Sequence, residues 1–250
     1  MKLIRYLFFV FTAFCLAFYS QTAGANGDPA VARLLDDVVA RLPEEILVIE
    51  GVATVRQREG MRRGMVEAEF RFTIDLDLGA DIPRAVYSFF SMSGDPLEQM
   101  EVAHLVASNP QLLYRKGAGL EPAEAPPIDN FVRGSDLTWR DLSLAFLWWR
   151  NGTFAGHDRL RGRNCTVVEL RPPQALEDRD EFVRLWIDDE SLMLLQAETL
   201  VDGKAVRRLW VRSVKQIADR WMLKDLEVES FPGRRRTRMT VEEVSAPGQL

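Results

Sequence analysis

Cysteine, histidine and long apolar runs are scarce in this chain of 250 residues. It contains two cysteines and two histidines. Because Cys15 falls in the predicted leader described below, Cys165 remains alone and an intramolecular disulfide is excluded. Cys15 follows Phe14 rather than a small residue, so lipid attachment is not expected there. The remaining part, about 225 residues, is long enough to be stabilised by its core, and Cys165 is expected to be a small buried apolar group near Val167 and Val168.

The longest apolar run lies at the N-terminus. Two basic residues, Lys2 and Arg5, precede it, and a small-x-small cleavage site ends at Ala25. This arrangement is typical of a secretory signal peptide. We therefore expect residues 1–25 to be a signal peptide cleaved near Ala25, and residues 26–250 to form a single domain that is exported to the periplasm.

An excess of positive charge is absent. The chain has 32 Lys and Arg against 37 Asp and Glu, which gives a formal net charge of −5, and the predicted leader holds two of the basic residues. Nucleic-acid-binding domains usually carry a basic surface. A mildly acidic chain therefore argues against a nucleic-acid partner.

Catalytic and metal-binding motifs are missing as well. Neither His104 nor His157 lies near a serine or cysteine in a recognisable nucleophile setting, so both are interpreted as structural. The sequence from Asp75 to Asp81 resembles the start of a calcium loop, but it lacks the closing glutamate of such loops. The end of a strand followed by a turn is the better interpretation. No catalytic residue, metal ligand or cofactor is predicted, and we expect that the protein is not an enzyme.

The dominant feature is a series of β-type patterns. Residues 66–78 alternate strictly between apolar and polar side chains, which indicates an antiparallel strand with one solvated face. Its length favours a large, strongly curved sheet. Residues 201–204, Val-Asp-Gly-Lys, predict a two-residue hairpin turn. The sequence thus predicts a mainly β (α+β) fold with about ten or eleven strands, at residues 46–55, 66–78, 85–92, 100–106, 112–115, 164–170, 182–187, 192–201, 205–214, 221–229 and 236–244.

Two helices are predicted among these strands. The first begins after Asp28 as N-cap and ends at Pro43. The second covers residues 138–149, where Thr138 and Asp141 form a potential capping box. It is apolar around nearly its whole circumference, so it must be buried on more than one side or face a ligand. We expect it to be the plug or lid of the curved sheet, although an ordinary core helix packed on a sheet would give the same pattern.

Apolar side chains exceed what one core face requires. Strand 182–187 carries large apolar groups on both faces, and all six tryptophans lie in the second half of the chain. Simple burial explains many of these side chains individually, but a ligand-binding cavity would explain the excess. The candidates for lining the cavity or forming its lid are Phe70, Phe72, Ile74, Trp139, Leu144, Phe146, Trp148, Trp149, Trp186 and Trp210.

Five motifs in a fixed order carry a family resemblance. They are GSDLTWRDLSLAFLW, GRNCTVVEL, VRLWIDDESLMLLQAE, DGKAVRRLWV and DRWMLKDLEV, and they begin at residues 134, 162, 183, 202 and 219. Together they resemble the outer-membrane lipoprotein-sorting family, which is similar to the lipoprotein carrier LolA and its receptor LolB. The resemblance covers about residues 110–245, and the N-terminal strands match only in pattern.

The resemblance implies a curved antiparallel half-barrel with helices covering its open side over a hydrophobic cavity. In LolA-type proteins this cavity takes the acyl chains of a lipoprotein. The implied function is a periplasmic carrier of acyl chains, monomeric and without a cofactor, that works with an inner-membrane transporter or an outer-membrane receptor. The functional arginine of the carrier corresponds only to a region here, with Arg56, Arg58, Arg62 and Arg63 as candidates.

Two other functions fit the same sequence. A non-enzymatic interaction module, such as an envelope sensor or a transporter accessory protein, would use the same apolar groove to bind a segment of a protein partner. An enzyme that acts on a lipid would need a polar residue with a shifted pKa at the floor of the cavity. The absence of a lipid-attachment cysteine separates this chain from LolB-like receptors, which are themselves anchored.

Overall fold

The computed structural model describes residues 27–61, 63–173, 180–217, 220–233 and 235–246. The predicted signal peptide, residues 1–25, and Arg62 lie outside this part. Thirteen strands and three short helices are formed within it. The strands are β1 (Leu47–Gln57), β2 (Val66–Asp77), β3 (Arg84–Phe90), β4 (Pro96–Ala103), β5 (Gln111–Lys116), β6 (Glu121–Ala123), β7 (Gly152–Leu160), β8 (Arg163–Leu170), β9 (Glu181–Asp188), β10 (Leu194–Val201), β11 (Lys204–Ile217), β12 (Arg220–Ser230) and β13 (Arg235–Ser245).

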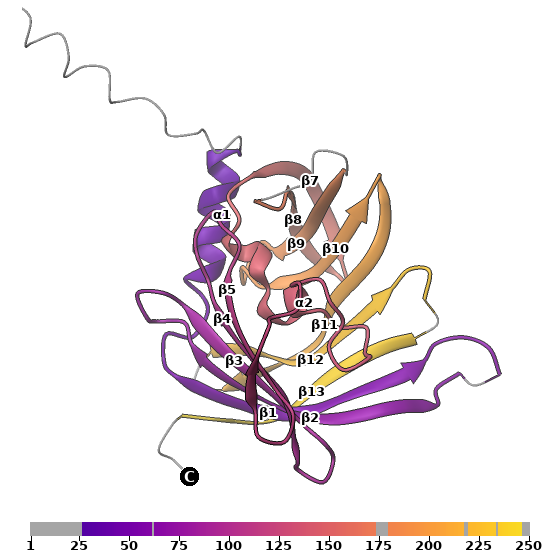
Figure 1. The fold of residues 1–250 in the computed structure, drawn as a ribbon. Helices are drawn as coiled ribbons and strands as arrows, with labels where there is room; N and C mark the ends of the chain where they lie inside the picture. The colour runs from indigo at the N-terminus through magenta and orange to yellow at the C-terminus, as the bar shows by residue number, and fades with distance from the viewer. Residues whose placement is uncertain (1–26, 62, 174–179, 218–219, 234, 247–250) are drawn as a thin grey trace, which may run out of the picture.

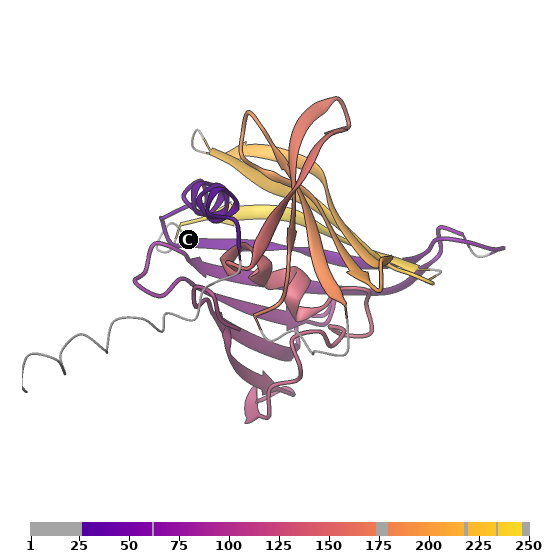
Figure 2. The same ribbon diagram turned by 90° about the horizontal axis from the view of Figure 1, so that it is seen from above.

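All of these strands belong to one open antiparallel sheet. Their order is β6-β5-β4-β3-β2-β1-β13-β12-β11-β10-β9-β8-β7, so the chain runs outward from β1 to one edge and returns from the other edge to β13 beside β1. The sheet curves strongly, and the helices lie on its concave side (Figures 1 and 2). This confirms the mainly β fold with a curved half-barrel. The predicted strands are all present, and β6 and β7 are two that the sequence did not predict.

Alternation along β2 determines which residues enter the core. Phe70 and Phe72 are buried, whereas their strand neighbours Glu69 and Arg71 are exposed. Gly51 on β1 makes room for this packing, because a Cβ at this position would lie 2.6 Å from the ring of Phe72 and 2.1 Å from a backbone oxygen of β13. A glycine is therefore required where the sheet bends at the β1–β13 bulge.

Two local predictions are confirmed by backbone geometry. Asp202 and Gly203 both have positive φ, 50° and 72°, as a two-residue type I′ hairpin turn requires. Helix α1 (Pro29–Val39) begins after Asp28, whose side chain accepts a hydrogen bond from the Ala30 backbone N–H at 2.8 Å. The buried face of α1 packs onto the concave side of the sheet with Val31, Leu35 and Val38.

The predicted helix over residues 138–149 is not continuous. It consists of helix α2 (Trp139–Ser143) and the 3₁₀ helix η1 (Ala145–Trp148), separated by Leu144 in a left-handed conformation with φ of 49°. The capping box is present, because Thr138 and Asp141 exchange backbone and side-chain hydrogen bonds of 2.9 and 3.2 Å. The Tyr87 hydroxyl donates to the Leu142 carbonyl at 3.0 Å and satisfies an orphan group at the end of α2. Tertiary packing on several sides thus replaces one continuous helix by two short ones. We call residues 131–149, which contain both, the plug.

The convex face of the sheet carries a small apolar cluster of its own. Cys165, Val167 and Trp186 are buried together there, on the opposite side of β8 and β9 from the main core. The prediction that β9 is apolar on both faces is therefore correct. Burial raises the pKa of the Cys165 thiol, and its side chain is fully covered.

This cluster predicts the reactivity of the thiol. In the native protein, Cys165 is expected to react with a thiol-specific reagent on the order of 100-fold more slowly than in denaturant, because access requires a local opening that costs about 3 kcal/mol. The reaction can be followed by absorbance with a disulfide reagent at pH 8. Equal rates in both conditions would show that the convex cluster is not formed.

Charged residues also form a ladder across the convex face. Residues of alternating sign stand opposite one another in the register of six consecutive strands from β8 to β13. Three arginines surround one carboxylate in the adjacent row, with Glu227 at 2.5 Å from Arg236, 3.0 Å from Arg238 and 3.3 Å from Arg212. Opposite charges directly across strands stabilise a sheet. The members of the ladder are Glu169, Arg184, Glu198, Arg208, Glu229 and Arg236.

Candidate functional site

An apolar cavity lies on the concave side of the sheet, beside the plug. Its walls come from the C-terminal end of α1, the first three strands, α2 and η1, and strands β10–β13. Its free volume is about 220 Å³. An apolar cavity of ~150 Å³ is enough to hold benzene, so this space is larger than a single aromatic ring needs. The interior is therefore not filled by the side chains of the described chain.

The cavity is open on one side. Several of its apolar walls are only half-buried, including Leu42 after α1, Ile74 on β2, Leu226 on β12 and Val241 on β13. Aliphatic groups that remain partly exposed around a concave space are characteristic of a ligand site, because ordinary folding would have covered them. The cavity is therefore an apolar groove that is closed at its base and open to solvent on one side.

The structure brings four of the predicted cavity residues to this space. Phe72, Ile74, Leu144 and Trp148 are among its lining residues. Phe70, Trp139, Phe146 and Trp149 are buried in the same core without lining the cavity. Of these, Phe70 and Trp139 both meet Phe89 edge-to-face, at ring distances of 5.5 and 5.7 Å, and Phe146 meets Trp149 at 6.4 Å. Of these contacts, the one between Phe89 and Trp139 joins the plug to the sheet.

Trp186 and Trp210, predicted as cavity or lid residues, lie on the other face of the sheet. Their strand neighbours Leu185 and Leu209 point into the main core, so alternation directs both indoles to the convex side. There the Trp186 Nε1 donates to Asp158 at 2.9 Å. The sequence could not assign the face because β9 carries large apolar groups on both sides.

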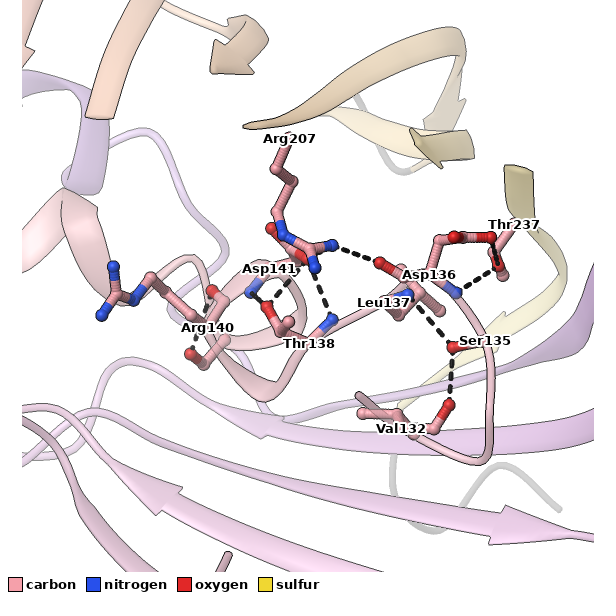
Figure 3. Close-up of polar contacts among 10 residues, drawn as sticks. Val132, Ser135, Asp136, Leu137, Thr138, Arg140, Asp141, Arg207 and Thr237 are labelled. Atoms are coloured by element: carbon pink, nitrogen blue, oxygen red, sulfur yellow. Dashed lines mark hydrogen bonds and ion pairs between the residues drawn. The ribbon is translucent and has the colours of Figure 1, made fainter. Parts of the chain in front are cut away.

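The plug is anchored by polar contacts as well as by apolar packing (Figure 3). Arg207 of β11 donates to the Asp136 carbonyl and lies 3.1 Å from Asp141 Oδ2. Thr237 of β13 accepts a hydrogen bond of 2.8 Å from the Asp136 backbone N–H. Ser135 donates to the Val132 carbonyl at 2.6 Å and closes the turn before α2. Strands from the C-terminal half therefore hold the start of the plug at two points.

These contacts change the interpretation of the plug. Lifting it would expose Trp139, Phe146, Trp148 and Trp149, all of which are buried. Each large apolar side chain contributes ~1.5–3 kcal/mol on burial, so opening would cost about 6–12 kcal/mol, which is comparable to the whole stability of a domain. We therefore interpret the plug as a fixed wall rather than as a moving lid.

The loop before the plug, residues 117–130, is partly ordered by pairing. Residues 121–123 within it form β6, which pairs with β5. Further along, Arg140 of α2 lies 2.7 Å from Asp129 and 2.6 Å from Glu181, and its guanidinium covers the ring of Trp149. Burial raises the pKa of Asp129, although the nearby Arg140 acts in the opposite direction. The loop is therefore fastened to the plug.

Few polar groups line the cavity. Arg41 and Lys224 are exposed at its periphery, and Asp141 already pairs with Arg207. His104 lies at the end of β4 with its ring stacked on Trp148 at a centroid distance of 3.7 Å and an angle of 8°. Burial lowers the pKa of His104 to about 4, so its imidazole is neutral at pH 7. The space is thus largely apolar, and the neutral imidazole of His104 forms part of its wall.

Of the arginines proposed as counterparts of a functional arginine, the three that the structure describes, Arg56, Arg58 and Arg63, do not line this cavity. Arg58 lies 2.5 Å from Glu229 and 2.8 Å from Glu59, and these contacts raise its pKa. Arg56 donates to the Gly64 carbonyl at 3.3 Å. Arg63 lies in the same β1–β2 turn, where its backbone N–H donates to the Gly60 carbonyl. Arginines near the site are instead Arg41 and Arg207.

Several cavity residues were not identified from the sequence. His104, Leu192, Leu226 and Met239 come from segments far apart in the chain and meet only through the sheet order. Alternation in β13 places Met239 and Val241 on one face, but the sequence pattern does not indicate which face of the sheet is concave. Among the residues that the structure describes, no group of three or more His, Cys, Asp or Glu side chains is arranged to hold a metal ion.

In the same described part, none of the helices has both the length and the apolar character required to cross a bilayer. A family model described as an uncharacterized protein matches residues 127–249. No curated protein sequence matches the chain.

Solved structures define the fold class. A putative outer-membrane lipoprotein-sorting protein domain from Vibrio parahaemolyticus has a TM-score of 0.71 at 12% identity, covering 91% of this chain and 95% of its own. A DUF1329 family protein from Desulfovibrio piger gives 0.70 at 14% identity, with 88% and 93% covered. A LolA superfamily protein from Nitrosomonas europaea gives 0.59 at 8% identity, with 90% and 95% covered. The chain therefore shares the fold of these three structures, which is LolA-like.

Proposed function

We propose that this protein is a periplasmic binding protein that carries the acyl chains of a lipid or lipoprotein in its concave cavity, without catalysis. The observation that carries the proposal is the apolar cavity of about 220 Å³ with half-buried aliphatic walls. Location in the periplasm follows from the predicted signal peptide. The LolA-like fold supports the same function, because it is shared by a LolA superfamily protein and by a domain named as a putative outer-membrane lipoprotein-sorting protein.

The energetics of such binding need no reactive group. Each buried CH₂ group contributes ~0.8 kcal/mol, so a chain of ~12 carbons contributes roughly 10 kcal/mol before the entropy of ordering is subtracted. Reversible transfer requires that the loaded and empty states remain close in free energy. A cavity with a fixed plug and an open side meets this requirement, because loading does not demand that a buried helix be displaced.

A cavity-filling substitution tests the proposal. Leu226→Trp places an indole in the half-buried wall on β12, and it is expected to weaken binding of the fluorescent hydrophobe N-phenyl-1-naphthylamine by about tenfold or more. Binding is measured from the fluorescence increase on titration. Ile74→Trp blocks the same space from β2 and serves as a second variant if Leu226→Trp does not fold.

The matched control is Leu113→Trp, at a leucine of β5 that is 64% exposed outside the cavity. It should bind the probe as the wild type does. If the wild type does not bind the probe, or if both cavity variants bind it normally, the acyl-carrier proposal is wrong. Capture of an extended peptide by the wild type, with no uptake of lipid, would instead support the interaction module.

The remaining components of the proposal concern partners. A carrier of this class receives its cargo from an inner-membrane transporter or delivers it to an outer-membrane receptor. Because one chain supplies the walls of the cavity, the proposed binding does not require a second copy. The groove that binds acyl chains is also the surface that a partner would have to approach during transfer.

A further inference from the structure

His104 is the polar side chain that the binding of plain hydrocarbon does not explain. It is 4% exposed and lines the cavity, yet within the described chain its imidazole has no hydrogen-bond partner. Buried polar groups in proteins are nearly always hydrogen-bonded, because an unpaired one loses its interactions with water without compensation. An unpaired imidazole in a binding cavity therefore indicates a group that is satisfied when the site is occupied.

The ring nitrogens of His104 remain accessible. The indole nitrogens of Trp149 and Trp210 are sealed from solvent and have no hydrogen-bond partner. The two ring nitrogens of His104 are not sealed in this way. The free space that His104 lines is the cavity. The stack on Trp148 fixes the plane of the imidazole, so its edge, which bears the N–H donor and the acceptor nitrogen, is held in one orientation.

Resting on the proposed function, we propose that the cavity is selective for amphiphiles with an uncharged oxygen group, a hydroxyl or an ester carbonyl, that hydrogen-bonds to His104. The apolar walls take the hydrocarbon part of such a ligand, and the neutral ring can donate to a carbonyl or both donate to and accept from a hydroxyl. A pure hydrocarbon would leave the ring unpaired.

A carboxylate is the disfavoured alternative at this position. The charged groups that line the cavity are Arg41, Asp141 and Lys224, and Asp141 is a carboxylate that would repel a second one. The cation paired with it, Arg207, is already used by the plug, while Arg41 and Lys224 are exposed at the periphery. Moving an ionised group to a buried neutral ring costs far more than one hydrogen bond returns.

Ligands with the same chain length separate these chemistries. Dodecanol, methyl laurate, dodecane and laurate are titrated into the purified protein preloaded with N-phenyl-1-naphthylamine, and displacement of the probe gives the affinity of each. Dodecanol and methyl laurate are expected to bind about three- to tenfold more tightly than dodecane, which is the size of one net hydrogen bond. Comparing dodecanol with methyl laurate distinguishes a hydroxyl from an ester as the preferred oxygen group.

Two variants connect the preference to His104. His104→Phe keeps a flat ring against Trp148 but removes both nitrogens, and it should abolish the preference, so that dodecanol and methyl laurate bind no more tightly than dodecane. His104→Gln retains a neutral donor and acceptor and should keep part of the preference. His104→Phe should leave the melting temperature of the empty protein unchanged or higher, because the imidazole makes no hydrogen bond to the described chain that the change would break. A histidine with only a structural role would instead lose stability on this change.

The outcomes separate this inference from the proposed function. If all four ligands displace the probe equally, or if His104→Phe retains the preference for dodecanol, the selectivity inference is wrong and the carrier proposal stands. Tighter binding of laurate than of dodecanol overturns the inference in the same way. If the probe does not bind at all, both proposals fail together.

Discussion

Arg207→Met is expected to lower the free energy of unfolding by about 3 kcal/mol. The arginine side chain is the cation for Asp141 at 3.1 Å, and it donates to the Asp136 carbonyl at the start of α2. Both members of the pair are mostly buried, with 13% and 6% of their side chains exposed. Removing one partner of a buried pair leaves the other uncompensated, and this loss is typically ~3–5 kcal/mol.

Chemical denaturation, followed by tryptophan fluorescence, measures the effect because Trp139, Trp148 and Trp149 all report on the plug. Arg184→Met is the matched control. It removes an arginine from an ion pair with Glu169 in which both side chains are about one-third exposed, and such pairs contribute less than about 1 kcal/mol. Equal losses for the two variants would show that the plug is not anchored through Arg207.

Glu227→Gln is expected to destabilise the convex side of the sheet by about 3 kcal/mol at neutral pH. The Glu227 side chain is fully covered, and three arginines lie within 3.3 Å of it. Burial alone would raise its pKa, but hydrogen bonds from Arg236 and Arg238, together with their charges, hold the pKa below its ordinary value of 4.5. Glutamine keeps the shape of the side chain and removes the charge.

The effect should depend on pH in one direction. Because the pKa of Glu227 is lower in the folded state than in the unfolded state, the folded protein binds fewer protons near that pH. Its contribution to stability is complete above pH of about 4.5 and is lost as the pH falls through the lower folded-state pKa. Urea denaturation at pH 7 and at pH 3 should therefore show a smaller difference between wild type and Glu227→Gln at the lower pH.

Glu169→Gln provides the comparison on the same face, since its side chain is 30% exposed and contacts a single arginine. It should cost less than about 1 kcal/mol at either pH. A loss for Glu227→Gln that is as small as this, or one that grows on acidification, would contradict the burial of an ionised Glu227.

Local signals in the sequence were sufficient for much of the fold. The alternation in residues 66–78, the Asp202–Gly203 turn and the exchange between Thr138 and Asp141 each depend on residues a few positions apart. The interactions that determine these features lie within a short segment. For that reason the folded protein retains them as predicted.

Features determined by distant contacts could not be predicted in this way. The break at Leu144 arises because a segment that is apolar on all sides packs against the core on several sides. Local helix propensity does not depend on these distant contacts, so it cannot predict the break. Strand β7 was missed because most of its side chains are exposed at the edge of the sheet, so it lacks an apolar alternation. The face of Trp186 and Trp210 was likewise ambiguous until the direction of curvature was known.

The candidate site shows the same limit. The sequence identified Phe72, Ile74 and Trp148 as apolar excess, but it gave no reason to join them to His104, which it treated as structural. The stack of His104 on Trp148 links residues 44 positions apart in the chain. Only the sheet order brings the end of β4 against the plug, and with it the neutral imidazole of His104 into an apolar wall.

Native mass spectrometry of the delipidated protein with a synthetic diacylated lipopeptide tests the central claim most directly. A cavity that binds acyl chains predicts a one-to-one adduct with the wild type and with Leu113→Trp, and its loss in Leu226→Trp. The absence of an adduct with the wild type, or an equally abundant adduct with Leu226→Trp, would contradict the account.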